Sequence, residues 1–308
     1  MKFTKMHGCG NDYIYVNGFT HSLTGEEKSK LAQTLSHRHF GIGADGLILI
    51  NPSDKADFEM EMYNADGSRG EMCGNGIRCV GKYVYDYGLT QSQQISVESY
   101  GAVKHLTLFT QNGKVQKVRV DMGSPIFPAA MIPVLPDRTG SNGKSSADLT
   151  ELRKSFPMLS EDAVIAQPIE AGGMTCEMTC VSMGNPHAVI MIDTPVSELS
   201  LDAIGPAFEN HKCFPNRVNT EFVEIVDRSR VKMRVWERGS GETLACGTGC
   251  CATAVACILA GKTDRKLSVE VLGGELEIEW DISSNVIYMT GPAATVFDGE
   301  VDTEDFLQ

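Results

Sequence analysis

Two short segments of the chain repeat one pattern, in which Cys-Gly-polar-Gly leads directly into helical sequence. Residues 72–79 read Met-Cys-Gly-Asn-Gly-Ile-Arg-Cys, and residues 245–251 read Ala-Cys-Gly-Thr-Gly-Cys-Cys. The repeat predicts two halves that each present one equivalent thiol, Cys73 and Cys246. A cysteine directly before a helix meets unpaired backbone N–H groups and the positive end of the helix dipole, which predicts a lowered thiol pKa. Two such thiols could face one carbon from opposite sides and move a proton across a stereocentre.

Length and charge limit the class of protein. The chain has 308 residues, of which 42% are hydrophobic and 22% charged, the composition of a soluble globular enzyme with room for two domains. Its formal net charge of −13 argues against a nucleic-acid or anionic membrane partner. No apolar run approaches the roughly 18 residues of a membrane span, and residues 1–5 lead into polar sequence rather than a signal peptide. We therefore expect a cytoplasmic protein.

The ten cysteines do not form a recognisable metal or redox motif. No Cys-x-x-Cys pair is present, and the nearest spacing, Cys176 to Cys180, has no matching second pair. A redox or metal-binding protein is therefore the disfavoured alternative, and we expect no metal site. Cys79, Cys250 and Cys251 fall within helical patterns and are expected to pack in the core.

Hydrophobic periodicity predicts many short strands and few helices. Strands are expected in the first half at residues 13–16, 47–50, 58–63, 95–99, 103–108 and 115–121, with helices at 26–39 and 75–87. The second half repeats this plan, with strands at 188–192, 220–226, 231–235, 267–272, 276–280 and 286–289 and a helix at 248–260. Because that last helix is apolar on nearly every face, we expect strands to enclose it.

Two further segments are not expected to form sites. Residues 124–175 contain six prolines and the polar stretch 137–146, which predicts a linker with a surface insertion. Residues 41–46 match the G-x-G-x-x-G pattern of nucleotide-binding folds, but a helical segment precedes them and a strand follows. Since the nucleotide-binding motif requires the opposite order, we predict no nucleotide site there.

Seven strings, in chain order, resemble the diaminopimelate epimerase family over nearly the whole chain. They are HGCGND (7–12), NADGS (64–68), MCGNGIRC (72–79), GNPH (184–187), FPNRVNTEF (214–222), WERG (236–239) and ACGTG (245–249). The resemblance implies an α/β (α+β) fold of two pseudo-symmetric halves. Each would be a curled, mainly antiparallel sheet wrapped around a central helix, with the active site in the cleft between them. We expect the halves at residues 1–125, joined by 295–308, and at 126–294.

The resemblance also implies an isomerase that converts LL-2,6-diaminopimelate into the meso isomer, for lysine and peptidoglycan precursor synthesis. Without pyridoxal phosphate, the protein itself must stabilise the charge that develops on the α-carboxylate. The Gly-x-Gly turns let backbone N–H groups approach an anion closely, and the expected donors are Gly74, Asn75, Gly247 and Thr248. Cys73 and Cys246 would act as acid and base, with no metal or organic cofactor.

By motif, the resemblance assigns the remaining substrate contacts. Glu237 would hold the reacting α-ammonium, Arg238 would pair the distal carboxylate, and His187 would lie close to a thiol. The other expected binding residues are Asn11, Asn64, Asn185 and Asn219. Gly46 stands where the family often carries a polar side chain, so this loop offers no side chain to the distal end.

Two questions about function stay open from the sequence. A related two-cysteine racemase acting on histidine or a proline derivative is the alternative function. A homodimer is also left open.

Overall fold

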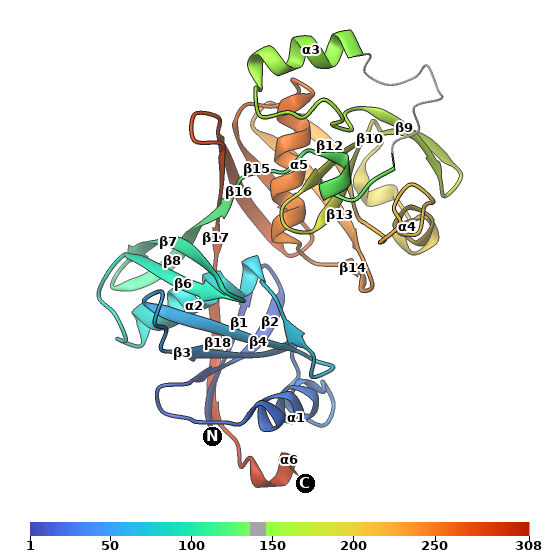
Figure 1. Ribbon diagram of the computed structural model, residues 1–308. Helices are drawn as coiled ribbons and strands as arrows, with labels where there is room; N and C mark the ends of the chain where they lie inside the picture. The colour runs from blue at the N-terminus through green and yellow to red at the C-terminus, as the bar shows by residue number, and fades with distance from the viewer. Residues whose placement is uncertain (136–145, 308) are drawn as a thin grey trace. The chain divides into compact units, whose positions relative to one another are not determined.

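The computed structural model describes residues 1–135 and 146–307 and divides into two compact units (Figure 1). The first unit comprises Met1–Asp121 with Thr290–Gln308, and the second comprises Met122–Met289. The domains expected from the sequence, 1–125 with 295–308 and 126–294, stay a prediction.

The first unit is built on a sheet whose paired strands follow the order β18, β1, β2, β3, β4, β6, β7, β8. The β2–β3 and β4–β6 pairs are parallel and the other pairs in this order are antiparallel. The strands are β1 (Lys2–Gly8), β2 (Asn11–Asn17), β3 (Gly46–Asn51), β4 (Phe58–Asn64), β6 (Gln94–Ser99), β7 (Ala102–Gln111), β8 (Lys114–Gly123) and β18 (Ala294–Glu300). The short β5 (Arg69–Gly70) pairs with β4, and α1 (Gly25–Ser36), α2 (Gly74–Asp86) and α6 (Glu304–Leu307) complete the unit.

The second unit repeats this topology, with strands in the order β9, β10, β11, β12, β13, β15, β16. Its parallel pairs, β11–β12 and β13–β15, occupy the places of the two parallel pairs in the first unit. The strands are β9 (Gln167–Ala171), β10 (Met174–Ser182), β11 (Pro186–Ile192), β12 (Asn219–Asp227), β13 (Arg230–Glu237), β14 (Gly241–Thr243), β15 (Lys266–Val271), β16 (Gly274–Asp281) and β17 (Val286–Pro292). The helices are η1 (Ala129–Met131), α3 (Ser146–Ser155), η2 (Val196–Glu198), α4 (Leu201–Glu209) and α5 (Gly247–Leu259). The repeat confirms the expected fold of two pseudo-symmetric, mainly antiparallel halves.

A central helix occupies the same topological position in each unit. Helix α2 joins β5 to β6, and helix α5 joins β14 to β15. Every residue of α5 from Gly249 to Leu259 is buried, and the helix contacts β10, β11, β12, β13, β15 and β16. A helix with no polar face is stable only when it is enclosed in this way, so the expected enclosure is confirmed.

The predicted helices begin close to their expected positions. The helix expected at 26–39 is α1, which Thr24 caps in a reciprocal capping box with Glu27 and which ends three residues early, at Ser36. The helices expected at 75–87 and 248–260 are α2 and α5, each one residue earlier in the chain. In both, the N-cap residue is the repeated cysteine, Cys73 or Cys246, so the sequence repeat places each thiol at a helix start.

The expectation that residues 124–175 form only a surface insertion is wrong for the part that the structure describes. Ile132, Val134, Val164 and Ile169 are all buried in the core of the second unit. The prolines interrupt any regular period, so these isolated apolar positions carried no sequence signal. Residues 137–145 of the polar stretch lie outside the described residues.

Within the described residues, 1–135 and 146–307, no helix is long and apolar enough to cross a membrane.

Gly205 of α4 allows the helix to pack directly on Trp236, which precedes the proposed binding residue Glu237 in the chain. A Cβ atom at Gly205 would lie 2.3 Å from Cδ2 of the Trp236 ring. We predict that Gly205→Ala lowers the free energy of unfolding by about 1–3 kcal/mol, through overpacking, and also lowers activity by displacing Trp236. Urea denaturation measures the first effect, and an assay of the activity expected from the sequence measures the second.

Gly25→Ala is the matched control, because a Cβ at this first residue of α1 meets nothing within 4 Å. Alanine should leave this helix as stable as glycine does, or slightly more stable. Equal stability of the two variants would contradict the packing assigned to Gly205.

Candidate active site

Cys73 is held at the start of α2 by one hydrogen bond that it accepts and one that it donates. Its Sγ accepts from the backbone N–H of Gly76 at 3.2 Å, so the thiol acts as the helix cap. The same Sγ donates to Oδ1 of Asn11 at 3.2 Å. The expected substrate residue Asn11 therefore lies directly against the first thiol.

Asp45 fixes the orientation of the Asn11 amide. Asn11 Nδ2 donates to Oδ2 of Asp45 at 2.7 Å, and Arg38 donates to Oδ1 of the same carboxylate at 2.8 Å. Because an ionised carboxylate only accepts hydrogen bonds, the amide nitrogen of Asn11 must face it, which turns the amide oxygen towards Cys73. Sequence reasoning missed Asp45, although the Gly-rich turn at residues 41–46 could have drawn attention to it.

The turn that carries Asn11 lies close to the start of α2. A Cβ atom at Gly8 would come within 2.9 Å of Nη2 of Arg78 and 3.0 Å of the Asn75 carbonyl oxygen. Arg78 is fully buried and donates to the Gly74 carbonyl at 2.9 Å and to Asn75 Oδ1 at 2.9 Å. Glycine at position 8 and the buried arginine thus set the expected anion donors Gly74 and Asn75 beside the Asn11 turn.

Asn64 and Asn11 lie at the same end of the strands of this sheet: Asn11 begins β2 and Asn64 ends β4. Gly46 of β3 pairs with Asn64 of β4 and with Tyr13 of β2, two residues beyond Asn11. A Cβ at Gly46 would lie 2.1 Å from the Tyr63 carbonyl oxygen, so the missing side chain permits close backbone packing. Asn64 Nδ2 donates to Ser68 Oγ at 3.0 Å, which folds the turn that leads towards Cys73.

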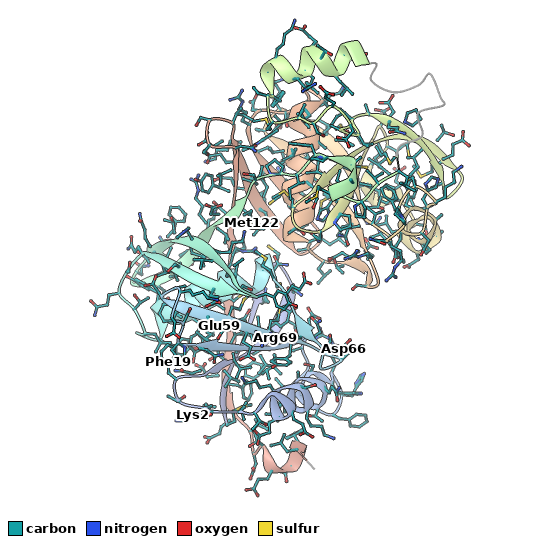
Figure 2. The ribbon with its side chains drawn as sticks, viewed as in Figure 1. Lys2, Phe19, Glu59, Asp66, Arg69 and Met122 are labelled. Carbon is teal, nitrogen blue, oxygen red and sulfur yellow. The ribbon has the colours of Figure 1, made fainter. Side chains whose placement is uncertain are left out.

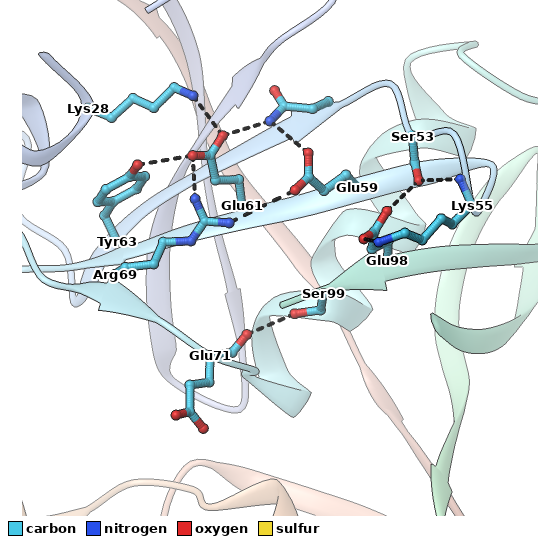
Figure 3. A network of polar contacts seen from close by, with 11 residues as sticks. Lys28, Ser53, Lys55, Glu59, Glu61, Tyr63, Arg69, Glu71, Glu98 and Ser99 are labelled. Atoms are coloured by element: carbon cyan, nitrogen blue, oxygen red, sulfur yellow. Dashed lines mark hydrogen bonds and ion pairs between the residues drawn. The ribbon is translucent and has the colours of Figure 1, made fainter. Parts of the chain in front are cut away.

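A polar network anchors the segment between Asn64 and Cys73 (Figure 3). Lys28, Tyr63 and Arg69 converge on the carboxylate of Glu61, which is buried on β4. Burial alone would raise the pKa of Glu61, but hydrogen bonds from Lys28 and its other partners outweigh burial and hold the pKa below the usual value. Arg69, which is labelled in Figure 2, lies on β5. Its ion pair with Glu61 therefore connects β4 to the short strand that precedes Cys73.

Cys246 differs from Cys73 in its surroundings. It is 5% exposed, and burial, together with the charges of Glu237 and Glu221, raises its pKa well above the usual value. The Thr248 hydroxyl and the Gly249 amide act in the opposite direction. The expected lowering of the Cys246 pKa by the helix start is therefore wrong, because burial and two carboxylates outweigh the helix.

His187 is fully buried between Glu221 and Asn185. Its Nδ1 lies 2.7 Å from Oε1 of Glu221, and its Nε2 lies 3.0 Å from Oδ1 of Asn185. Asn185 in turn donates to the Thr248 hydroxyl at 3.2 Å, and that hydroxyl lies 3.5 Å from Cys246 Sγ. The structure therefore connects the expected residues His187, Asn185 and Thr248 to the second thiol, and adds Glu221, which the sequence did not single out for a role.

The three remaining expected residues lie around the end of β13. Asn219 Nδ2 donates to the Pro186 carbonyl at 2.9 Å, and its Oδ1 accepts from the Arg238 backbone N–H at 2.9 Å. The carboxylate of Glu237 accepts from the Thr243 hydroxyl. Arg238 Nη1 donates to the Asn216 carbonyl at 3.2 Å, and Arg238 is exposed. Asn219 thus links the turn that carries Asn185 to the Glu237–Arg238 corner.

Each unit therefore gathers its own share of the predicted site. In the first unit, Asn11 contacts Cys73, and the start of α2 supplies Gly74 and Asn75. In the second unit, the start of α5 supplies Gly247 and Thr248, and the side chains of Asn185, His187 and Thr248 lead to Cys246.

Solved structures of other proteins share the fold of this chain. A phenazine biosynthesis protein of the PhzF family from Bacillus anthracis matches with a TM-score of 0.64 and 15% identity, over 98% of each chain. A hydroxyproline epimerase from Agrobacterium vitis matches with a TM-score of 0.62 and 12% identity, over 97% of this chain and 91% of the other. At these identities the match shows the shared fold alone.

Sequence comparison identifies the family of this chain. The sequence model described as "Diaminopimelate epimerase" matches residues 3–128 and 179–296. A diaminopimelate epimerase from Agathobacter rectalis is 55% identical over 302 residues, covering 98% of this chain and 99% of the relative. The chain belongs to the diaminopimelate epimerase family. The unmatched residues 129–178 fall almost wholly within the segment that the sequence analysis treated as an insertion.

Proposed function

We propose that this protein converts LL-2,6-diaminopimelate into the meso isomer, a step of lysine and peptidoglycan precursor synthesis, with Cys73 and Cys246 as the two proton-transfer groups. The observation that carries the proposal is the repeated placement of one cysteine at the N-cap of each central helix. One thiolate removes the α-proton from one face of the carbon, and the other thiol returns a proton to the opposite face. The roles exchange in the reverse direction.

The helix starts supply the electrostatic part of the reaction. As the α-proton leaves, negative charge develops on the α-carboxylate, and the first amides of each helix are oriented to donate to an anion. The donors that we assign are the backbone N–H groups of Gly74, Asn75, Gly247 and Thr248. This arrangement supplies the charge stabilisation that pyridoxal phosphate supplies in cofactor-dependent amino-acid racemases.

The two thiols have different surroundings, which supports a division of labour. Cys73 donates a hydrogen bond to Oδ1 of Asn11 and so carries its proton, as the acid partner would. Burial, together with the charges of Glu237 and Glu221, raises the pKa of Cys246, so a nearby positive charge would favour its thiolate. The substrate α-ammonium, which we place against Glu237, would weaken the opposing effect of that carboxylate on Cys246.

The first test of the proposal is removal of each thiol. Cys73→Ala or Cys246→Ala should lower kcat for epimerisation by about 10²–10⁴-fold or more, because each removes an acid–base group. Chiral chromatography of the LL and meso isomers, with no added cofactor, measures the rate. Cys79→Ala and Cys251→Ala, which alter fully buried thiols inside the same two helices, serve as controls and should retain activity. Ordinary activity of Cys246→Ala would refute the two-thiol mechanism.

Recognition of the distal end separates this function from its alternative, a two-cysteine racemase for histidine or a proline derivative. A planar guanidinium such as that of Arg238 can hold a second carboxylate in bidentate fashion. Asn11, Asn64, Asn185 and Asn219 would bind the rest of the substrate with hydrogen bonds. A monocarboxylate would leave Arg238 without its ligand, which disfavours the alternative.

Arg238→Lys tests this assignment, because lysine keeps the charge but loses the planar fork. We predict a fall in kcat/KM for diaminopimelate on the order of 10²-fold. Arg228→Lys is the matched control, since Arg228 forms an exposed ion pair with Asp264 and should tolerate the same change. If Arg238→Lys kept full activity on diaminopimelate, the second carboxylate would have to be bound elsewhere.

Location and assembly stay predictions. The location that we propose is the cytoplasm. A homodimer is left open, and the half-exposed side chains of Val296 and Phe297 on β18 would offer apolar surface for it. We propose no nucleic-acid, membrane, metal or cofactor partner.

A further inference from the structure

A continuous chain of hydrogen-bonding groups runs through the second unit and ends at Cys246. Glu221 Oε1 lies 2.7 Å from His187 Nδ1, and His187 Nε2 lies 3.0 Å from Asn185 Oδ1. Asn185 Nδ2 lies 3.2 Å from Thr248 Oγ1, which lies 3.5 Å from Cys246 Sγ. The chain therefore joins β12, β11, the turn before β11 and the start of α5.

The hydrogen bond from Asn185 to Thr248 sets a direction for the links on either side of it. Asn185 donates through Nδ2 to Thr248, so its Oδ1 faces His187 and requires a proton on Nε2 of the imidazole. Since Thr248 Oγ1 accepts from Asn185, its own hydrogen is left to donate to Cys246. A donor at the sulfur favours the thiolate.

The direction of these hydrogen bonds depends on one proton, which Glu221 and His187 share at the end farthest from Cys246. With Nε2 protonated, the short contact between His187 Nδ1 and Glu221 needs a further proton, either on the carboxyl group or on the imidazole. If that shared proton leaves, the remaining imidazole proton is drawn to Nδ1, against the carboxylate. Nε2 then accepts from a rotated Asn185 amide, Thr248 donates to Asn185, and the thiol of Cys246 donates to Thr248. This reversed direction of the hydrogen bonds favours the thiol form of Cys246.

Glu221 is placed so that its protonation matters. It is fully buried, and its Oε2 has no hydrogen-bond partner within the described ranges 1–135 and 146–307. A Cβ atom at Gly249 would lie 2.7 Å from Glu221 Oε1, so the carboxyl group lies against the first turn of α5. An ionised carboxylate with an unpartnered oxygen is costly in such a site, whereas the protonated form is tolerated.

The neighbouring groups act on both ends of the chain. Glu237 on β13 and Glu221 on β12 oppose ionisation of Cys246. Burial raises the pKa of Glu221, the charge of His187 on β11 lowers it, and Glu237 raises it. Burial raises the pKa of the Cys180 thiol on β10, and the charge of Glu221 raises it further.

We propose that Glu221 is a positioning residue that, through the proton it shares with His187, sets the direction of this chain and so whether Cys246 is held as thiolate or thiol. The proposal rests on the proposed function only in taking Cys246 as a group that must act as base in one direction and acid in the other. A thiol whose environment can present either a donor or an acceptor suits both roles.

The test measures ionisation of Cys246 directly and needs no substrate. In a Cys73→Ala background, the rate of iodoacetamide alkylation at Cys246 is followed against pH by peptide mass spectrometry. Thr248→Val removes the final donor and should raise the pH midpoint by about one unit, a roughly tenfold loss of thiolate below the midpoint. Thr248→Ser keeps the hydroxyl and should restore the wild-type midpoint.

Glu221→Met should move the midpoint in the opposite direction, downwards by about one unit. Methionine has a similar shape, removes the carboxylate, and leaves His187 with its proton on Nε2, which fixes the donor direction towards Cys246. Glu224→Met, on the same strand and bonded to the Val196 backbone instead, is the control and should leave the midpoint unchanged.

Opposite shifts in the Thr248→Val and Glu221→Met variants support the proposal, because general loosening of the fold would move both midpoints the same way. An unchanged midpoint in Thr248→Val, or an upward shift in a folded Glu221→Met variant, would overturn it. Neither outcome depends on whether the protein epimerises diaminopimelate, so failure of this inference is distinguishable from failure of the proposed function.

Discussion

The structure depends on two buried helices, each contacting the strands of its own unit and each with a cysteine at its N-cap position. Glycine fits the crowded first turn of both helices: a Cβ at Gly76 would lie 2.9 Å from Ile48 Cδ1, and one at Gly249 would lie 2.7 Å from Glu221 Oε1. Close packing at these two positions keeps each thiol beside the first amides of its helix. An anion that approaches either helix start therefore meets a thiol and backbone donors together.

The repeated topology does not make the two thiols equivalent. Cys73 caps its helix through sulfur and donates to Asn11, whose orientation is set by Asp45. Cys246 has no capping hydrogen bond through its side chain, and the carboxyl groups of Glu221 and Glu237 act on it. The backbone has kept the symmetry of the repeat, and the side chains around it have diverged, so the same residue type meets different electrostatic surroundings.

The sequence predicted what depends on local pattern. The helix starts at Cys73 and Cys246 follow from glycine spacing and apolar period, and these predictions were correct to one residue. The helix α4 and the buried positions around Val164 were missed, because prolines and short elements give no periodic signal. The raised pKa of Cys246 could not be predicted, because Glu221 and Glu237 approach it only after β12 and β13 pair.

The most direct measurement of the two-thiol mechanism is isotope incorporation during turnover of LL-diaminopimelate in heavy water. If one thiolate removes the α-proton and a second, solvent-exchanged thiol returns a deuteron, deuterium should enter the meso product well before the unreacted LL pool. Mass spectrometry of the separated isomers at low conversion measures both. Early deuterium in the LL pool, at a rate comparable to that of product formation, would indicate a single base and contradict the assignment of Cys73 and Cys246 to opposite faces of the carbon.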